Sequence, residues 1–141
     1  MRPALWASLA AVLLVAAGCG AGTEVDPPRP APTSLTIAFE PRGPEGPTLR
    51  ATLGCNPHVG THPNRFAACA ALLGNLSALD PVPGDVACTE IFGGPERARI
   101  RGIVTSRGQG VVEREIDARL SRSNGCEIER WDRLEPLLDL Q

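Results

Sequence analysis

The sequence predicts an α+β domain in which one main helix packs on a small antiparallel sheet held by disulfides. Several short stretches alternate apolar and polar residues, as half-buried strands do, whereas one stretch repeats apolar residues at helical spacing. Four of the five cysteines lie in the same part of the chain, which is too small to build a large apolar core. Disulfides would supply the missing stability.

The predicted domain runs from residue 34 to residue 141 and begins with a hairpin. Residues 35–39 alternate between apolar and polar or small side chains, which predicts a half-buried strand. Residues 42–47 contain two prolines and two glycines and predict a turn. Residues 49–53 alternate again, so they predict the second strand of the hairpin.

The clearest predicted helix covers residues 64–76, with Asn64 as its N-cap. Its apolar residues recur at three- and four-residue spacing: Phe66, Cys69, Leu72, Leu73 and Leu76. We expect this side of the helix to face the core.

Two more strands and a C-terminal amphipathic segment complete the predicted domain. The core face of the third strand consists of Ala98, Ile100, Gly102 and Val104. After a turn around residues 108–110, the core face of the fourth strand consists of Val112, Arg114, Ile116, Ala118 and Leu120. The C-terminal segment, interrupted at Pro136, presents Trp131, Leu134, Leu137 and Leu138.

Residues 1–18 have the features of an export signal. Arg2 precedes an apolar stretch, residues 4–17, that is too short to span a bilayer. Small residues then lead directly to Cys19, as in the lipobox of bacterial lipoproteins, where the cysteine sulfur receives a diacylglyceryl group. We therefore expect an exported protein anchored through Cys19 to the outer face of the cytoplasmic membrane. The alternative is a plain secretory signal cut near residues 18–21, which would leave Cys19 as a free thiol in a secreted protein.

Residues 19–33 predict a proline-rich linker between the membrane and the domain. A polyproline-like conformation rises about 3.1 Å per residue, so the linker would reach about 40 Å. The formal net charge of the chain is −2. A balance so close to neutral gives no electrostatic reason to expect nucleic acid as a partner.

The four domain cysteines, Cys55, Cys69, Cys88 and Cys126, allow three pairings. Their placement favours Cys55 with Cys69, which joins the end of a strand to the first turn of the helix. The remaining pair then ties a long loop at Cys88 to the end of the last strand at Cys126.

A zinc site is the rival interpretation of this region, because His58 and His62 lie between Cys55 and Cys69. An oxidising compartment disfavours it, since such cysteines form disulfides there, and the usual paired CxxC spacing is absent. We therefore expect no metal and no other cofactor, and we interpret both histidines as loop residues. No arrangement typical of an active site stands out, so we expect no enzyme activity.

All four domain cysteines lie in three stretches whose order and spacing are distinctive. The first joins residues 53–57 (LGCNP), 60–63 (GTHP) and 68–72 (ACAAL). The second is residues 87–95 (ACTEIFGGP), and the third joins residues 108–110 (GQG) and 123–128 (SNGCEI). This ordered set resembles the Streptomyces subtilisin inhibitor family of serine protease inhibitors. The resemblance implies a five-stranded antiparallel sheet with two helices, the two pairings given above, and a homodimer formed through the sheets.

The resemblance also implies a reactive loop that enters a protease cleft as a substrate would. The scissile bond would follow the second residue after the loop cysteine, Cys88, and is therefore Glu90–Ile91. Thr89 and Phe92 would fill neighbouring subsites. The disulfide at Cys88 would hold the loop, so that binding costs little ordering entropy.

Two features depart from the best-known inhibitors of this family. The best-known inhibitors carry Met or Lys at the position of Glu90. Burying an unpaired carboxylate in an apolar pocket is costly. We therefore expect the partner to be an extracellular serine protease that prefers Glu. Gly93 and Gly94 add backbone freedom after the bond, and fixing each costs about 1–2 kcal/mol. The alternative function is thus a non-inhibitory cell-envelope lipoprotein that keeps the fold as a binding module.

Overall fold

The structure is a computed structural model that describes residues 32–108 and 110–141. Outside the described residues lie the predicted export signal with Arg2, Cys19, the predicted linker up to residue 31, and Gln109. The first elements are β1 (Thr33–Glu40), the 3-10 helix η1 (Gly43–Glu45), β2 (Leu49–Cys55), α1 (Arg65–Gly74) and the 3-10 helix η2 (Leu76–Leu79). The later elements are β3 (Gly94–Gly108), β4 (Gly110–Arg122), α2 (Gly125–Arg133) and α3 (Glu135–Leu138).

The strands form one antiparallel sheet in the order β2-β1-β3-β4. The α+β class and the predicted hairpin are confirmed, but the described residues contain four strands and three α-helices rather than five strands and two helices. The segment between η2 and β3, residues 80–93, forms an irregular loop. Pro81 and Pro83 have no backbone N–H to donate to a strand ladder, so its first part is a poor candidate for a fifth strand.

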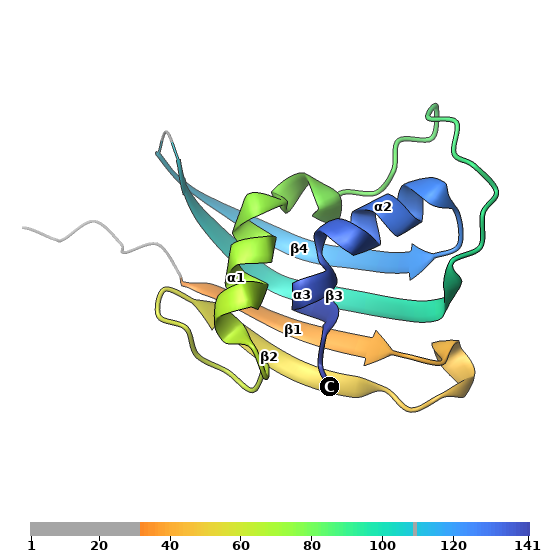
Figure 1. The fold of residues 1–141 in the computed structure, drawn as a ribbon. Coiled ribbons are helices and arrows are strands. Elements are labelled where there is room, and N and C mark those ends of the chain that lie inside the picture. The colour runs from red at the N-terminus through yellow and green to blue at the C-terminus, as the bar shows by residue number, and fades with distance from the viewer. Residues whose placement is uncertain (1–31, 109) are drawn as a thin grey trace, which may run out of the picture.

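One face of the sheet is covered by helices and the other is not (Figure 1). The strands bury their predicted core faces: Leu35, Ile37 and Phe39 in β1, Leu53 in β2, Ala98, Ile100 and Val104 in β3, and Ile116, Ala118 and Leu120 in β4. The apolar residues of the C-terminal segment also join this core, which confirms their prediction. Pro136 does not interrupt a helix, however, because it lies in the first turn of α3, where its missing N–H is harmless.

The apolar side of α1 was predicted too broadly. The helix buries Ala68, Cys69 and Leu72, whereas Phe66 is 70% exposed and Leu73 is 38% exposed. At about 100° per residue, Phe66 and Leu73 point about 100–120° away from Leu72, beyond the stripe that the sheet covers. Phe66 instead stacks on His58, with a ring-centroid separation of 4.3 Å.

The outer half of the β3–β4 hairpin extends beyond the rest of the sheet. Pairing of β3 with β1 ends at Ile103, but its pairing with β4 continues to the turn. Val112 is consequently 59% exposed and Arg114 is only half-buried, so their prediction as core residues was wrong. The Arg114 guanidinium forms an ion pair with Asp80 at the end of η2.

His62 is a loop residue as predicted, but it is fully buried. Its Nδ1 lies 3.1 Å from the Asn64 backbone N–H and accepts its hydrogen bond. The proton is therefore on Nε2, which donates to the carbonyl oxygen of Leu137 at 3.1 Å. This histidine thus connects the segment before α1 to α3.

Candidate functional site

The predicted reactive loop lies in the irregular segment between η2 and β3. Thr89 and Glu90 are exposed, and the apolar side chains of Ile91 and Phe92 are 60% and 69% exposed. Adjacent apolar side chains in solvent gain nothing for the fold, and clustered apolar exposure is typical of a contact surface. The loop therefore presents a carboxylate and two apolar groups to any partner.

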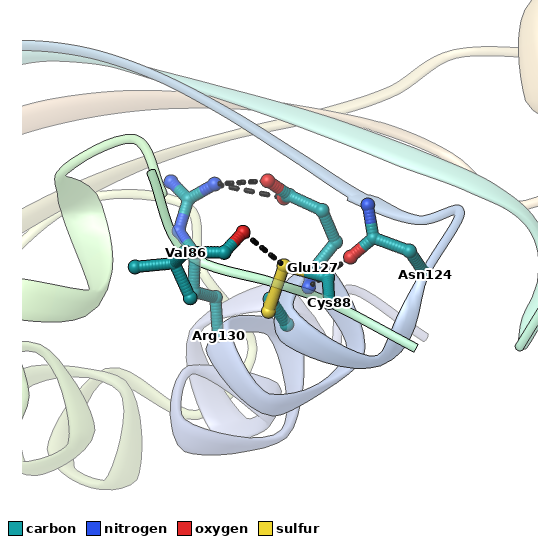
Figure 2. The surroundings of a disulfide bond; sticks show 6 residues. Val86, Cys88, Asn124, Glu127 and Arg130 are labelled. Carbon is teal, nitrogen blue, oxygen red and sulfur yellow. Dashed lines mark hydrogen bonds and ion pairs between the residues drawn. A yellow bond between two sulfur atoms is a disulfide. The ribbon is translucent and has the colours of Figure 1, made fainter. Parts of the chain in front are cut away.

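The loop is joined covalently to α2 by the Cys88–Cys126 disulfide, with Cα atoms 5.4 Å apart (Figure 2). The pairing was predicted, but Cys126 lies in the first turn of α2 and not at the end of the last strand, because β4 ends at Arg122. The Cys88 Sγ also lies 3.8 Å from the carbonyl oxygen of Val86. A disulfide sulfur has no proton to donate, so we interpret this as a van der Waals contact.

Two backbone hydrogen bonds bracket the exposed residues. On one side, the Gly125 N–H donates to the carbonyl oxygen of Thr89 at 3.0 Å. On the other side, the Gly93 N–H donates to the carbonyl oxygen of Arg122 at 2.7 Å. Only residues 90–92 lie between these two attachment points, so the chain is held immediately before and after the exposed side chains.

The first turn of α2 provides most of this support. Asn124 caps the helix, since its Oδ1 accepts the Glu127 N–H at 3.0 Å. The N–H groups of a first helical turn have no partner within the helix, and that of Gly125 is used by the loop. Ile128 lies under the other side of the loop, because a Cβ on Gly93 would come within 2.8 Å of Ile128 Cδ1.

A largely buried ion pair fixes α2 to the rest of the domain. Arg130 Nη1 donates to both carboxylate oxygens of Glu127, at 2.7 and 3.0 Å (Figure 2). Arg130 Nε donates to the carbonyl oxygen of Ala78 at 3.0 Å, and Nη2 lies 3.4 Å from that of Arg119. The helix that supports the loop is therefore connected to η2 and to β4.

The two glycines after the predicted bond are held in place by their surroundings. Gly93 makes the hydrogen bond to Arg122 described above, and Gly94 pairs with Arg122 as the first residue of β3. The φ of Gly94 is +147°, a conformation that other residues rarely adopt. The glycines lose their freedom on folding. The missing side chain of Gly93 leaves room for Ile128, and that of Gly94 leaves room for the Glu96 carboxylate.

The other disulfide joins Cys55 at the end of β2 to Cys69 in α1, as predicted. Cys69 lies in the second turn of the helix rather than the first. Because both sulfurs are oxidised, neither cysteine offers a thiolate to a metal. In residues 32–108 and 110–141, no group of three or more His, Cys, Asp or Glu side chains could hold a metal ion.

Sequence reasoning missed the residues beneath the loop, namely Arg122, Gly125 and Ile128. It began the C-terminal amphipathic segment at Trp131, whereas α2 starts at Gly125. The available signal was Asn124 followed three residues later by Glu127, the spacing of a capping box.

A small domain that displays an exposed loop between a disulfide and a strand belongs to the class of proteins that bind a partner through one pre-ordered loop. Comparison with protein families sharpens this class, since the subtilisin inhibitor-like family model matches residues 31–111. The chain therefore belongs to the subtilisin inhibitor-like family, whose members are serine protease inhibitors and not enzymes. The match includes the Glu90–Ile91 bond and ends before α2 and Cys126. A search of curated proteins found no match.

Proposed function

We propose that this chain inhibits a serine protease by presenting the Glu90–Ile91 bond in its cleft. Family membership supplies the class of partner. The observation that carries the choice of bond is the loop itself: hydrogen bonds at Thr89 and Gly93 hold the backbone on both sides, while the side chains of residues 90–92 stay exposed.

Rigidity is the physical basis of the proposed inhibition. A flexible peptide loses conformational entropy when it enters a cleft, whereas a loop already held in one conformation loses little. If the protease cuts the bond, Glu90 stays attached through Cys88, and Ile91 stays attached through Gly93 and β3. Neither new end leaves the cleft, so the cut bond can re-form.

The side chain of Glu90 would enter the primary pocket of the protease. A carboxylate buried without a partner is strongly unfavourable, so this pocket must offer cationic or hydrogen-bond-donating groups. Ile91 and Phe92 would fill the subsites on the other side of the bond. The proposed target is therefore a serine protease that cleaves after Glu.

Inhibition of a panel of glutamyl-, trypsin- and subtilisin-type proteases tests this proposal. Glu90→Arg should weaken inhibition of a glutamyl protease about a hundredfold or more, because a primary-pocket residue carries over 2 kcal/mol of binding. It should also improve inhibition of a trypsin-type protease. Glu45→Arg in η1 makes the same charge change away from the loop and should alter neither. Tight inhibition that Glu90→Arg leaves unchanged would show that another segment enters the cleft.

The alternative function, a non-inhibitory binding module, makes the opposite prediction in the same assay. The carboxylate of Glu90, where the best-known inhibitors carry Met or Lys, is the feature that favours it. Rapid cleavage of the loop at Glu90–Ile91 by the glutamyl protease, with no lasting complex with any protease of the panel, would select this alternative.

We further propose that the protein acts at the outer face of the cytoplasmic membrane, held by a lipid on Cys19. The support is the sequence alone: an apolar leader and small residues directly before the cysteine. None of the helices in the described residues is long and apolar enough to cross a membrane. Cys19→Ser should move the protein from the membrane fraction to the soluble exported fraction. Unchanged fractionation of this variant would contradict the lipid anchor.

A further inference from the structure

The outer side of α1 is apolar although it faces solvent. Phe66, Ala70 and Leu73 follow one another at four- and three-residue spacing, so they form one stripe along the helix, and all three are exposed. Arg65 is the only charged residue among the ten of this helix. A surface helix normally presents polar side chains to solvent, whereas a helix that is apolar all round is normally buried. The stripe is therefore suited to a partner that removes it from water.

A loop beside the helix extends this apolar stripe. The His58 ring packs on Phe66, and the next residue, Val59, is 52% exposed. Val59 is held in place because it exchanges two backbone hydrogen bonds with Gly54 at the end of β2, at 2.8 and 3.1 Å. The outer apolar surface defined in this way consists of Val59, Phe66, Ala70 and Leu73.

This surface lies beside the point where the N-terminal linker enters the domain. Pro32, the first described residue, and Val59 line the same hollow of about 350 Å³. Thr33 pairs with Cys55 in the sheet, and the Cys55 disulfide connects this strand end to α1. Figure 1 shows that β1 begins at the end of the sheet where β2 leads into the loop before α1. A lipid on Cys19 would therefore draw this end of the molecule toward the membrane.

The reactive loop lies at the opposite end of the sheet (Figure 1). β3 begins at Gly94 beside the loop and reaches Thr105, whose N–H donates to Thr33 Oγ1 at 2.9 Å. At about 3.3 Å per residue, Gly94 and Thr105 lie about 35 Å apart. Contact of the linker end with a membrane would thus leave the Glu90–Ile91 bond accessible to a protease in solution.

The charge around the outer apolar surface is low and of both signs. Residues 46–79 contain no Asp or Glu, although the chain has 16 acidic residues. The Arg65 Nη1 donates to two carbonyl oxygens of the loop before α1, at 3.3 and 3.4 Å. The neighbouring helix α3, which packs against α1, carries Glu135 and is followed by Asp139, and both are exposed. A partner on this surface must therefore be held by apolar contact rather than by charge.

We infer that the outer apolar surface lies against the lipid bilayer to which the linker tethers the domain. A helix with an apolar outer face lies in the plane of a membrane interface, with its apolar side chains at the boundary of the acyl chains. The tether makes a weak contact sufficient, because a domain held by a short linker acts at a high effective concentration. This inference rests on the proposed lipid at Cys19. It concerns the helical side of the sheet and leaves the other face free for a second copy of the chain.

Tryptophan quenching on vesicles tests the inference. Residues 19–141, which include every described residue, are coupled through the Cys19 sulfur to a maleimide lipid in vesicles of phosphatidylglycerol and phosphatidylcholine. The leader with Trp6 is absent, and Trp131 is only 7% exposed. Phospholipids brominated on their acyl chains should remove about half of the emission that Phe66→Trp adds, because this side chain contacts lipid. Phe92→Trp is the matched control on the exposed reactive loop, and its emission should not change.

The coupling separates this inference from the proposed lipid anchor. The maleimide lipid anchors the domain whether or not cells acylate the cysteine. Fractionation of Cys19→Ser tests the anchor, and quenching tests the surface.

Vesicle binding of the unanchored chain, Cys19→Ser, provides a second measurement. Adding Phe66→Gln and Leu73→Gln should weaken binding about tenfold, because the exposed parts of two apolar side chains no longer leave water. Adding Ile91→Gln and Phe92→Gln instead removes apolar surface from the reactive loop and should alter binding less than about twofold. High salt should also alter binding less than about twofold, since salt screens charges and not apolar contacts.

Two controls in solution separate membrane contact from the other uses of this surface. The Phe66/Leu73 variant should keep the wild-type melting temperature and inhibition constant, because both side chains are exposed and lie outside the reactive loop. Each of four results would overturn the inference: no quenching of Phe66→Trp, equal weakening of vesicle binding in the two double variants, binding that high salt abolishes, or weaker inhibition in solution by the Phe66/Leu73 variant. The last result would place the protease on this surface instead of lipid.

Discussion

Helices α1 and α2 begin in the same way but support different parts of the molecule. Each is capped by an asparagine whose Oδ1 accepts a backbone N–H: Asn64 from Ala67 at 3.2 Å, and Asn124 from Glu127 at 3.0 Å. Each also carries one cysteine of a disulfide. Cys69 is 2% exposed and lies in the core with Cys55, whereas Cys88 and Cys126 are half-buried near the surface.

The difference shows how one kind of crosslink can have two purposes. The Cys55–Cys69 bond connects two regular elements that already pack together through the core. The Cys88–Cys126 bond connects a helix to a segment without regular structure. We therefore expect both bonds to stabilise the fold, but only the second to hold the conformation of the loop. The following variants test this comparison, from the largest expected effect to the smallest.

Removal of the surface disulfide should have the largest effect. By the chain-entropy model, closing 38 residues contributes about 4 kcal/mol, so Cys88→Ala with Cys126→Ala should lower the free energy of unfolding by up to that amount. The freed loop should also be cut at Glu90–Ile91 without lasting inhibition. Urea unfolding and a cleavage assay measure the two effects. An unchanged inhibition constant would show that the hydrogen bonds alone hold the loop.

Removal of the core disulfide should affect stability but not the loop. A separation of 14 residues corresponds to about 3 kcal/mol for Cys55→Ala with Cys69→Ala. The remaining folded protein should inhibit with the wild-type constant, measured per folded molecule. If both double variants lose inhibition equally, the proposed division between the two bonds is wrong.

A single methyl group tests the contact between α2 and the loop. A Cβ at Gly125 would clash with Thr89 Oγ1, so Gly125→Ala must move the Thr89 side chain. We expect inhibition about tenfold weaker, equivalent to about 1.4 kcal/mol. Gly84→Ala is the matched control in the same loop, because nothing lies within 4 Å of its added Cβ. Equal inhibition constants for the two variants would show that the loop adapts freely.

Substitution of the N-cap asparagines of α1 and α2 should have a smaller effect, and the two variants can be compared directly. Asn64→Ala and Asn124→Ala should each lower the free energy of unfolding by about 1 kcal/mol in urea titrations. Of these two variants, only Asn124→Ala should weaken inhibition, since α2 is the helix that is crosslinked and hydrogen-bonded to the loop. A larger loss of inhibition from Asn64→Ala would reverse the roles assigned to the two helices.

The smallest effect concerns an ion pair on the face of the sheet that carries no helix, where Arg99 donates hydrogen bonds of 2.7 and 2.8 Å to Asp117. Hydrogen bonds from Arg99 lower the pKa of Asp117 from 3.8 to about 2. This pair therefore stabilises the folded state fully above pH 3.8, and its contribution disappears as the pH falls through about 2. Asp117→Asn should lose less stability than the wild type between pH 4 and pH 2, measured by thermal unfolding. An identical pH profile would show that solvent screens the pair completely.

The sequence predicted the parts of the fold in which periodicity and burial coincide. The alternation in β1, β2 and β3 identified the core faces, and local placement of the cysteines identified both disulfides. Periodicity failed where neighbouring elements stop short: Phe66 lies beyond the stripe of α1 covered by the sheet, and Val112 lies beyond the end of β1.

The support of the candidate site was harder to predict than its exposed residues. Motif and spacing located Glu90 and Ile91, but the hydrogen bonds of Arg122 and Gly125 use backbone groups, so no side-chain pattern in the sequence marks them. Only the fold brings residues so distant in sequence together.

The central position of β1 has a consequence for how the domain acquires its structure. This first strand pairs with β2 nearby in sequence, but also with β3, where Thr36 lies opposite Arg101. The sheet cannot close until about two thirds of the described chain is available, and contacts of such long sequence separation slow folding. Before β3 is available, β1 and β2 can form only a hairpin, so the sheet and the core beneath it are completed late along the chain.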